Sequence, residues 1–384
     1  MTRHAQQLGK TLLSDVLVRR WAVTLWLLVL VTCSPSDALR PSAPGRLAVV
    51  AGLQSNRLLA VDLNSGTIKT LVPGVFTDGI IAGDPEGRLV FARSRTVQGA
   101  RGVLAIEPAT SKTLWTAGGL GHEIDFSLSE TLVASTAGDA LLVCNVVRAT
   151  KPGAVLLEPS TGRVLRFLDG LPCTSASAMP PSGSLPSGGF ALFGRRDQSR
   201  RSIDSLFLLS AQTFEIVDSL AAPASPLWGA VAAPDGRSLY LAAGTRLFKY
   251  DLALKRIAAS VPSPIPLGLL TVGSRAGHLL LSDPGVSIDL PGLGFIYEYD
   301  GGLALVRAID LRSFSEANGT PPTMGPAQLT TDGALVVVAT GTPERGSLYG
   351  VQRSRLLVVN YQDGAPVRAI NLKDWGAGLV LPLK

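Results

Sequence analysis

His122 and Glu123 are adjacent and form the pair of residues in this sequence best suited to proton transfer. General acid–base catalysis needs a proton carrier near a second titratable group, and a histidine beside a carboxylate meets that need. A hydrogen-bonded pair that lines a channel explains the same two residues without catalysis. We predict that both lie at the mouth of a central channel with residues that begin comparable segments, namely Asp78, His122, Glu123, Trp228, Met324 and Trp375.

Arginine doublets are the second candidate for binding chemistry. Arg195–Arg196 and Arg200–Arg201 present guanidinium forks, which suit carboxylate and phosphate groups. Comparable segments add further cations to a basic patch, namely Arg95, Arg101, Arg148, Lys151, Arg345 and Arg353. Fewer acids accompany them, namely Asp139, Asp197, Asp283, Asp289 and Glu344. The patch indicates either a site for a protein or a small anionic ligand, or a rim that only keeps the protein soluble.

The three cysteines are spaced too far apart to suggest a metal site. Cys33 stands alone near the N-terminus, so Cys144 and Cys173 remain as a pair that a disulfide can join in an oxidising compartment. Two separate buried thiols are the alternative. Thiol and imidazole groups lack zinc-binding spacing, and P-loop, dinucleotide-binding and Gly-x-Ser-x-Gly motifs are absent from the sequence. We therefore predict no metal and no cofactor, and we favour a binding protein over an enzyme.

The N-terminal segment predicts export. Arg19 and Arg20 precede an uncharged run of twelve residues, 21–32, which suits a signal peptide and is short for a membrane-spanning helix of about 20 residues. Leu30–Cys33 resembles the lipobox of bacterial lipoproteins, which implies lipidation of Cys33. Ordinary cleavage after Ala38 is the alternative. We predict a signal peptide over 1–32, a linker over 33–45, and an outer-membrane or periplasmic lipoprotein, or a secreted protein.

A repeated pattern must position these candidate residues. Four mostly apolar residues, one polar residue, a turn and a second apolar run recur seven times. The polar residues are Asp62, Glu107, Glu158, Ser210, Asp251, Tyr299 and Asn360. A turn and a short apolar strand precede each copy, as in 44–52, 129–136 and 234–244. Repeats of this length are typical of four-stranded propeller blades, which predicts an all-β, seven-bladed β-propeller.

The two ends of the domain predict how the ring closes. The first copy lacks an innermost strand, whereas a surplus apolar segment, 378–383, follows the last copy. Because open sheet edges are a liability, we predict that this C-terminal strand completes the first blade. The domain then covers 46–384, with blades at 46–73 plus 377–383, 77–116, 122–169, 174–220, 226–261, 266–310 and 323–372. Long connections between second and third strands are predicted at 94–102, 137–153, 195–202, 283–294 and 341–354.

Several of these repeats resemble the Tyr-Val-Thr-Asn type β-propeller repeats of bacterial surface and periplasmic proteins. The resemblance is carried by 226–260 and by parts of the first and third copies. It implies a propeller, but that group includes binding proteins, lactonases and amine dehydrogenase subunits, so fold alone does not choose a function. The segment 105–115 resembles the docking motif of quinoprotein-type propellers, with Glu107 and Ser111 in place of Asp and Gly.

These patterns favour a non-enzymatic propeller that presents a ligand- or protein-binding face at the cell envelope. A lactonase-like or quinoprotein-like enzyme that uses the central channel is one alternative, and a scaffold subunit of an envelope complex is another. The formal net charge of +6 falls once the leader is removed, which is too weak a bias for a nucleic-acid partner. We predict membrane contact only through an N-terminal lipid.

Overall fold

The computed structural model divides the chain into two units, Met1–Pro44 and Gly45–Lys384. The residues it describes all belong to the second unit. They are 46–51, 57–73, 80–95, 101–118, 123–126, 131–171, 173, 175–183, 185–195, 204–224, 227–265, 277–282, 293–315, 323–325, 327–343, 351–372 and 379–383. The side chains of Arg195 and Trp228 lie outside this description, although their backbone is included.

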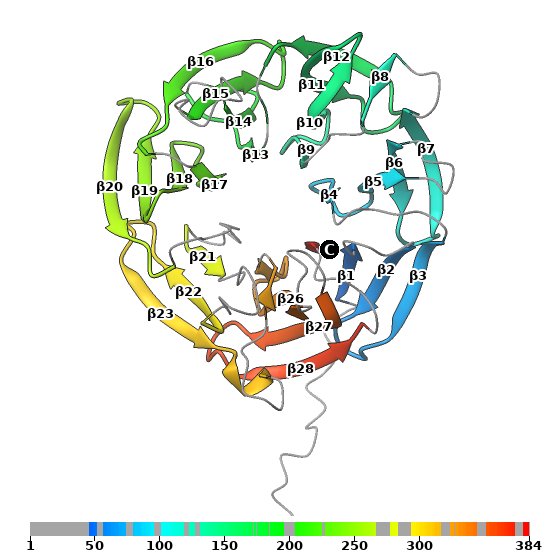
Figure 1. Cartoon of the computed structure of the whole chain (residues 1–384), viewed down its shortest axis with the longest axis vertical. Helices are drawn as coiled ribbons and strands as arrows, with labels where there is room; N and C mark the ends of the chain where they lie inside the picture. Colours follow the sequence, from blue (N-terminus) through cyan, green and yellow to red (C-terminus); the bar gives the residue numbers. More distant parts are fainter. Residues whose placement is uncertain are drawn as a thin grey trace, which may run out of the picture. The chain divides into compact units, whose positions relative to one another are not determined.

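Seven antiparallel sheets form a ring in the second unit (Figure 1). From the innermost to the outermost strand, blade one contains β29 (Leu379–Pro382), β1 (Leu47–Ala51), β2 (Arg57–Asp62) and β3 (Ile68–Pro73). Blade two contains β4 (Ile81–Gly83), β5 (Val90–Arg95), β6 (Arg101–Glu107) and β7 (Lys112–Gly118). Blade three contains β8 (Ile124–Asp125) and β9 (Thr131–Ala134), then β10 (Leu141–Arg148), β11 (Lys151–Leu157) and β12 (Val164–Asp169).

The remaining four blades follow in chain order. Blade four contains β13 (Ser175–Met179), β14 (Gly189–Arg195), β15 (Asp204–Ser210) and β16 (Ile216–Ala221). Blade five contains β17 (Leu227–Ala232), β18 (Ser238–Ala243), β19 (Arg246–Asp251) and β20 (Arg256–Pro262). The described part of blade six contains β21 (Leu279–Ser282), β22 (Phe295–Tyr299) and β23 (Leu305–Asp310), followed by the 3-10 helix η1 (Arg312–Phe314). Blade seven contains β24 (Thr323–Met324), β25 (Gln328–Leu329), β26 (Leu335–Pro343), β27 (Val351–Asn360) and β28 (Pro366–Asn371).

The predicted ring closure is confirmed. β29 from the C-terminus pairs antiparallel with β1, with Val49 opposite Leu381 and Val50 opposite Val380. Figure 1 shows the C-terminus beside β1 and the last outer strand, β28, next to blade one. An ion pair also joins blades one and seven, because Arg46 Nη2 lies 2.6 Å from Asp332 Oδ2.

The hydrophobic core consists of seven clusters, one between each pair of neighbouring blades. The cluster between blades two and three, for example, contains Phe91 and Val103 from one sheet and Leu141 and Val155 from the other. Successive side chains in a strand point to opposite faces, so each blade packs one set of residues against each neighbour. The other six clusters repeat this arrangement and complete the ring.

Blade three differs from its predicted form. We expected 129–136 to be a second strand and 137–153 a long loop, and both predictions are wrong. Thr131–Ala134 is the innermost strand β9, and the second strand is β10. A two-residue turn joins β10 to β11, with positive φ at Ala149 (46°) and Thr150 (75°). Such a turn usually carries Asn-Gly or Asp-Gly, so the Ala-Thr sequence gave no signal that a hairpin turn was present.

The turns between third and fourth strands share a side-chain cap. Asp62 Oδ1 accepts hydrogen bonds from the backbone N–H groups of Asn64 and Ser65, at 2.8 and 2.9 Å. Ser210 Oγ accepts two such bonds and Asp251 Oδ1 accepts one, at the equivalent positions of their blades. In blade six the cap is Asp300, one residue after Tyr299, the polar residue of that repeat.

Candidate functional site

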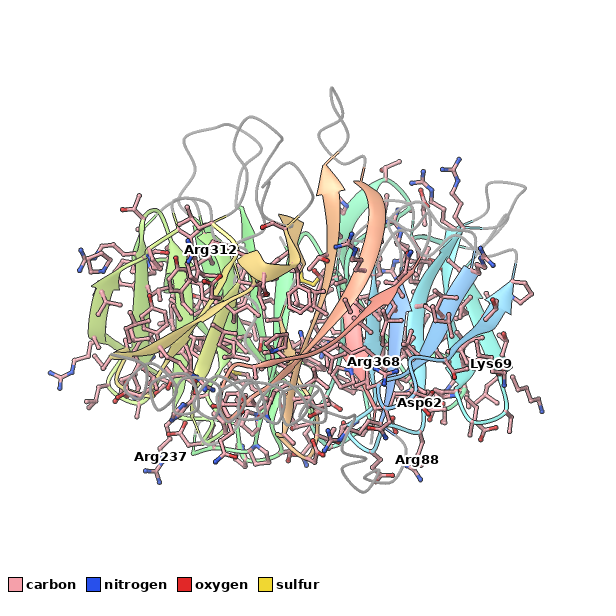
Figure 2. The ribbon with its side chains drawn as sticks, turned by 90° about the horizontal axis from the view of Figure 1, so that it is seen from below. Asp62, Lys69, Arg88, Arg237, Arg312 and Arg368 are labelled. Carbon is pink, nitrogen blue, oxygen red and sulfur yellow. A yellow bond between two sulfur atoms is a disulfide. The ribbon has the colours of Figure 1, made fainter. Side chains whose placement is uncertain are left out.

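The ring has two faces that differ in their connections. We call the "loop face" the side formed by connections between second and third strands, and the "turn face" the side formed by connections between third and fourth strands. Connections between third and fourth strands are uniformly short, from four residues (252–255) to six (158–163). Loop-face connections range from two residues (149–150) to twelve (283–294). In Figure 2, Arg88 and Arg237 lie toward one edge of the ring and Arg312 lies toward the other.

Most of the predicted channel-mouth and patch residues fall outside the described part of the chain. Asp78, His122, Trp375, Arg196, Arg200 and Arg201 are in that group, as are Cys33 and the N-terminal segment. Trp228 is the second residue of β17, an innermost strand, and Arg195 ends β14 at the loop face. Glu123 immediately precedes β8 and is exposed, and Met324 is buried in β24.

The described loop face contains a pair of arginines at the end of blade two. Arg95, the last residue of β5, is the direct cross-strand partner of Arg101, the first residue of β6. Arg93 precedes Arg95 by two positions and therefore shares its face of the sheet.

Blade three ends in a second pair of cations. Arg148 and Lys151 are cross-strand partners at the tip of the β10–β11 hairpin. The Arg148 guanidinium lies 4.5 Å above the Phe167 ring and 3.4 Å from Asp169 Oδ2. Glu123 Oε1 lies 3.8 Å from Arg148 Nε, so Glu123 pairs with Arg148 on the loop face. These contacts hold Arg148 in place, while its side chain stays 34% exposed and accessible to a ligand.

The cation pairs of blades two and three are on sheet faces that turn toward each other. Phe91 and Val103 pack against blade three, and Arg93, Arg95 and Arg101 follow them at alternate positions. In blade three, Val146 and Val155 pack against blade two, and Arg148 and Lys151 alternate with them. The loop-face end of this interface therefore gathers five cations, Arg93, Arg95, Arg101, Arg148 and Lys151. The acids Asp169 and Glu123 accompany them.

Asp139 does not belong to this site. It was predicted on a loop-face connection, and that prediction is wrong because Asp139 lies in the connection from β9 to β10 on the turn face. The Ser135 hydroxyl donates to its carboxylate at 2.6 Å. Its removal from the site leaves the blade-three part of the loop face more basic than the sequence indicated.

The disulfide lies on the other side of blade three. Cys144 and Cys173 are bonded, with Cα atoms 5.1 Å apart. Cys144 was predicted in a loop, whereas it lies in β10 at an irregularity of the pairing with β11, followed by Asn145 at a φ of 56°. Both cysteines are buried in the core cluster shared by blades three and four. The bond thus joins the second strand of blade three to the connection that leads into blade four.

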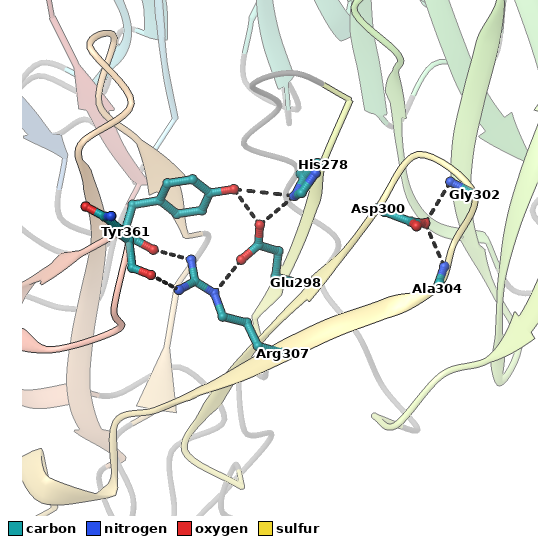
Figure 3. A network of polar contacts seen from close by, with 8 residues as sticks. His278, Glu298, Asp300, Gly302, Ala304, Arg307 and Tyr361 are labelled. Atoms are coloured by element: carbon teal, nitrogen blue, oxygen red, sulfur yellow. Dashed lines mark hydrogen bonds and ion pairs between the residues drawn. The ribbon is translucent and has the colours of Figure 1, made fainter.

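A buried carboxylate connects blades six and seven on the turn face (Figure 3). Glu298 is 2% exposed, and one of its oxygens lies 2.6 Å from His278 Nδ1 and accepts from the Tyr361 hydroxyl. Arg307 Nε donates to the other oxygen at 2.6 Å, and its remaining nitrogens donate to the carbonyls of Tyr361 and Gln362 in blade seven. All these groups are satisfied by one another, which makes the network a structural link.

Glu298 should give folding a pH dependence. Burial raises the pKa of the Glu298 carboxyl, but hydrogen bonds from Tyr361, His278 and Arg307 more than offset that effect and hold the pKa below its ordinary value. A lowered folded pKa contributes stability above the unfolded pKa of about 4.3, and this stability is lost as pH falls through the folded value. Glu298→Gln should lower the free energy of unfolding at pH 7 by about 1–3 kcal/mol.

Urea unfolding between pH 7 and 3 measures this effect. The difference between wild type and Glu298→Gln should shrink as pH falls below about 4.3. Glu86→Gln is the matched control, because Glu86 is an exposed turn-face carboxylate paired only with an exposed arginine. A constant difference across the whole pH range would show that the Glu298 charge does not contribute.

The described residues contain no group of three or more His, Cys, Asp or Glu side chains placed to hold a metal ion. Over the same part of the chain, the structure has no helix with the length and apolar character that spanning a membrane requires.

Similarity to solved structures is confined to the fold. The dihydro-heme d1 dehydrogenase NirN in complex with DHE aligns with a TM-score of 0.54 and 15% identity, over 87% of this chain and 74% of that chain. The Cps50 (Swd1) β-propeller domain from Myceliophteria thermophila has a TM-score of 0.54 and 14% identity, over 78% and 88%. A chain of the Mitotic Checkpoint Complex has a TM-score of 0.54 and 10% identity, over 79% and 81%. No family model and no curated protein matches the sequence.

The ring of sheets, its closure and these structural neighbours define the class of the protein. It is a seven-bladed β-propeller with a WD40-like architecture. At identities of 10–15% the neighbours carry no information on substrate or partner.

Proposed function

We propose that this chain is a non-enzymatic binding protein whose working surface is the loop face. The observation that carries the proposal is the difference between the two faces. Connections between third and fourth strands are short and capped, whereas connections between second and third strands vary from two to twelve residues on the same scaffold. Loops that vary in length on a rigid framework are where proteins place binding residues. The NirN and checkpoint-complex neighbours are compatible with both catalytic and binding propellers. The proposal of a binding function therefore rests on the difference between the connections of the two faces.

Hydrogen–deuterium exchange tests which face binds. The purified protein is compared with and without a detergent extract of envelope from its own host. We expect protection in peptides that cover 95–101, 148–151 and 195–204, and unchanged exchange in the turn-face peptides that cover 62–68 and 251–256. Protection confined to the turn face, or no protection on either face, would contradict the proposal.

We further propose that the protein is an exported member of the Tyr-Val-Thr-Asn type propellers, tethered to a membrane through a lipid on Cys33. The basic and apolar leader supports this, and so does the Cys144–Cys173 bond, because disulfides persist in oxidising compartments. The first described residue, Arg46, immediately precedes β1 at the turn face.

Cys33→Ala should release the protein from membranes. Without the thiol, no lipid can be attached, so the variant should move to the soluble fraction or stay unprocessed. Cell fractionation and intact mass measure both results, and Ala38→Leu, which changes only the alternative cleavage site, is the control. Unchanged membrane association together with cleavage after Ala38 would refute lipidation.

A further inference from the structure

One position in the outermost strand recurs in the contacts between blades. It is the partner of the third-strand residue two places before the polar residue of the turn, as Asp218 is the partner of Leu208, which precedes Ser210. We call it the "latch position", and its residues are Lys69, Trp115, Arg166, Asp218, Ala259, Arg307 and Arg368. We propose that this position holds the turn-face ends of neighbouring blades together. The inference concerns the turn face alone and does not depend on what the loop face binds.

Two arginines at the latch position donate hydrogen bonds to backbone carbonyls of the next blade. Arg166 Nη1 donates to the Thr213 carbonyl at 3.1 Å, across the junction of blades three and four. Arg307 donates to the carbonyls of Tyr361 and Gln362, across the junction of blades six and seven (Figure 3). Each acceptor lies in the turn between third and fourth strands. Because a guanidinium carries several N–H donors in one plane, a single arginine can hold more than one turn carbonyl.

Other kinds of side chain make the equivalent contact at further junctions. Trp115 Nε1 donates to the Pro159 carbonyl at 2.8 Å, across the junction of blades two and three. Asp218 Oδ2 lies 2.9 Å from Lys255 Nζ, which belongs to the turn of blade five. Guanidinium, indole and carboxylate groups therefore serve the same contact. What recurs is the position in the strand, and not one residue type.

Blade five shows that the contact can move to the neighbouring strand. Its latch position is occupied by Ala259, which has no polar side chain. The cross-strand partner of Ala259 is Lys249, and Lys249 Nζ donates to the Gly301 carbonyl in the turn of blade six at 2.7 Å. The Tyr240 hydroxyl donates to the same carbonyl at 3.2 Å. A lysine on the third strand thus makes the contact that the fourth strand cannot make.

Blade one lies at the two remaining junctions, and these differ from each other. Arg368 of blade seven packs against the turn of blade one, where a Cβ on Gly66 would lie 2.9 Å from Arg368 Nη1. Lys69 occupies the latch position of blade one and is exposed (Figure 2). Within the described part of the chain, Lys69 makes no polar contact with blade two. Lys69 therefore provides a matched control, since it has the same place in its strand without the contact.

Hydrogen–deuterium exchange of the blade-six turn tests the contact made by blade five. The N–H groups of residues 302–304 are hydrogen-bonded within this turn, so their exchange reports its opening. Lys249→Met keeps an apolar stem but removes the donor, and it should accelerate exchange of the peptide 300–305 by about five- to tenfold. Ala259→Arg in the Lys249→Met background should restore most of the protection, because the new donor enters the latch position itself.

A charge exchange tests the junction of blades four and five independently. Asp218→Lys and Lys255→Asp should each accelerate exchange of the peptide 251–256 by about two- to fivefold, since exposed ion pairs contribute little. The N–H group of Leu254, which donates to Asp251 Oδ1, reports opening of this turn. The double variant Asp218→Lys/Lys255→Asp should restore most of the protection, because the two charges again attract each other.

Lys69→Met is the control, and it should leave exchange of the blade-two turn, 107–112, unchanged. Acceleration there equal to that caused by Lys249→Met would overturn the inference, because loss of any exposed charge would then have the same effect. Failure of both Ala259→Arg and the charge exchange to restore protection would overturn it too. If Lys249→Met does not fold, the charge exchange decides alone, and single variants with wild-type exchange would contradict the role of the latch position.

Discussion

Deletion of the last six residues, Leu379–Lys384, is expected to remove the stable native state. These residues contain β29, which is the innermost strand of blade one and pairs with β1 over four residues. Without it, β1 becomes an open edge beside the channel, and open edges promote aggregation. The deletion also removes Leu381 and Leu383 from the core cluster shared by blades one and two.

The expected loss can be bracketed with a point variant. Leu383 is 6% exposed, and Leu383→Ala alone should lower the free energy of unfolding by about 2–5 kcal/mol. Removal of a whole strand should exceed this value and take a large part of a typical stability of about 5–15 kcal/mol. Thermal and urea unfolding measure both variants, with deletion of Lys384 alone as the control. A soluble six-residue truncation with wild-type stability would contradict the role assigned to β29.

The blade repeat was predictable because a largely buried apolar run recurs in the third strand of successive blades. Strands such as β2 and β6 are nearly continuous apolar runs that end in a polar turn residue, and burial between two neighbours requires that composition. Ring closure was predictable because one strand was missing at the start and one was surplus at the end. These features depend on local composition and on counting strands.

Features that depend on register were not predictable. β10 contains an irregularity at Cys144–Asn145, which reverses the alternation of inward and outward residues within the strand. The hairpin turn at Ala149–Thr150 lacks the usual residues for its conformation. As a result, the sequence predicted 129–136 as the second strand of blade three, whereas it contains the innermost strand β9. The same shift put Asp139 on the loop face in the prediction, whereas it lies on the turn face.

The candidate site was predictable in its residues but not in their pairing. Arg95, Arg101, Arg148 and Lys151 were all predicted members of a basic patch. That Arg95 faces Arg101 and Arg148 faces Lys151 follows from strand register, which a single sequence does not specify. The Glu298 network was missed, although a carboxylate within the apolar run of β22 was a signal, because buried carboxylates require partners.

Side-chain hydrogen bonds on the turn face join neighbouring blades. Trp115 Nε1 donates to the Pro159 carbonyl at 2.8 Å, which joins blades two and three. Arg166 Nη1 donates to the Thr213 carbonyl at 3.1 Å and joins blades three and four. These links leave from outer strands and end on the capped turns of the next blade. They hold neighbouring blades together at the turn face.

Loss of the Cys144–Cys173 disulfide is expected to have the second largest effect on stability. The bond closes a loop with a sequence separation of 29 residues. In the chain-entropy model such a loop stabilises the folded state by about 3–4 kcal/mol, because the cross-link restricts the unfolded chain. The loop spans the outer half of blade three and the connection into blade four. Its closure therefore limits opening of the interface between blades three and four.

The double variant Cys144→Ala/Cys173→Ala should melt roughly 5–10 °C below the wild type, because the unfolded chain gains the freedom that the bond removed. Alanine keeps both positions apolar in the core cluster, where the two cysteines are 0% and 4% exposed. Wild-type protein unfolded and refolded under reductant is the control and should melt near the variant. Thiol titration in denaturant should find no reactive Cys144 or Cys173 until reductant is added. Two free thiols in protein from an oxidising compartment, with unchanged melting of the variant, would show that the cysteines only fill the core.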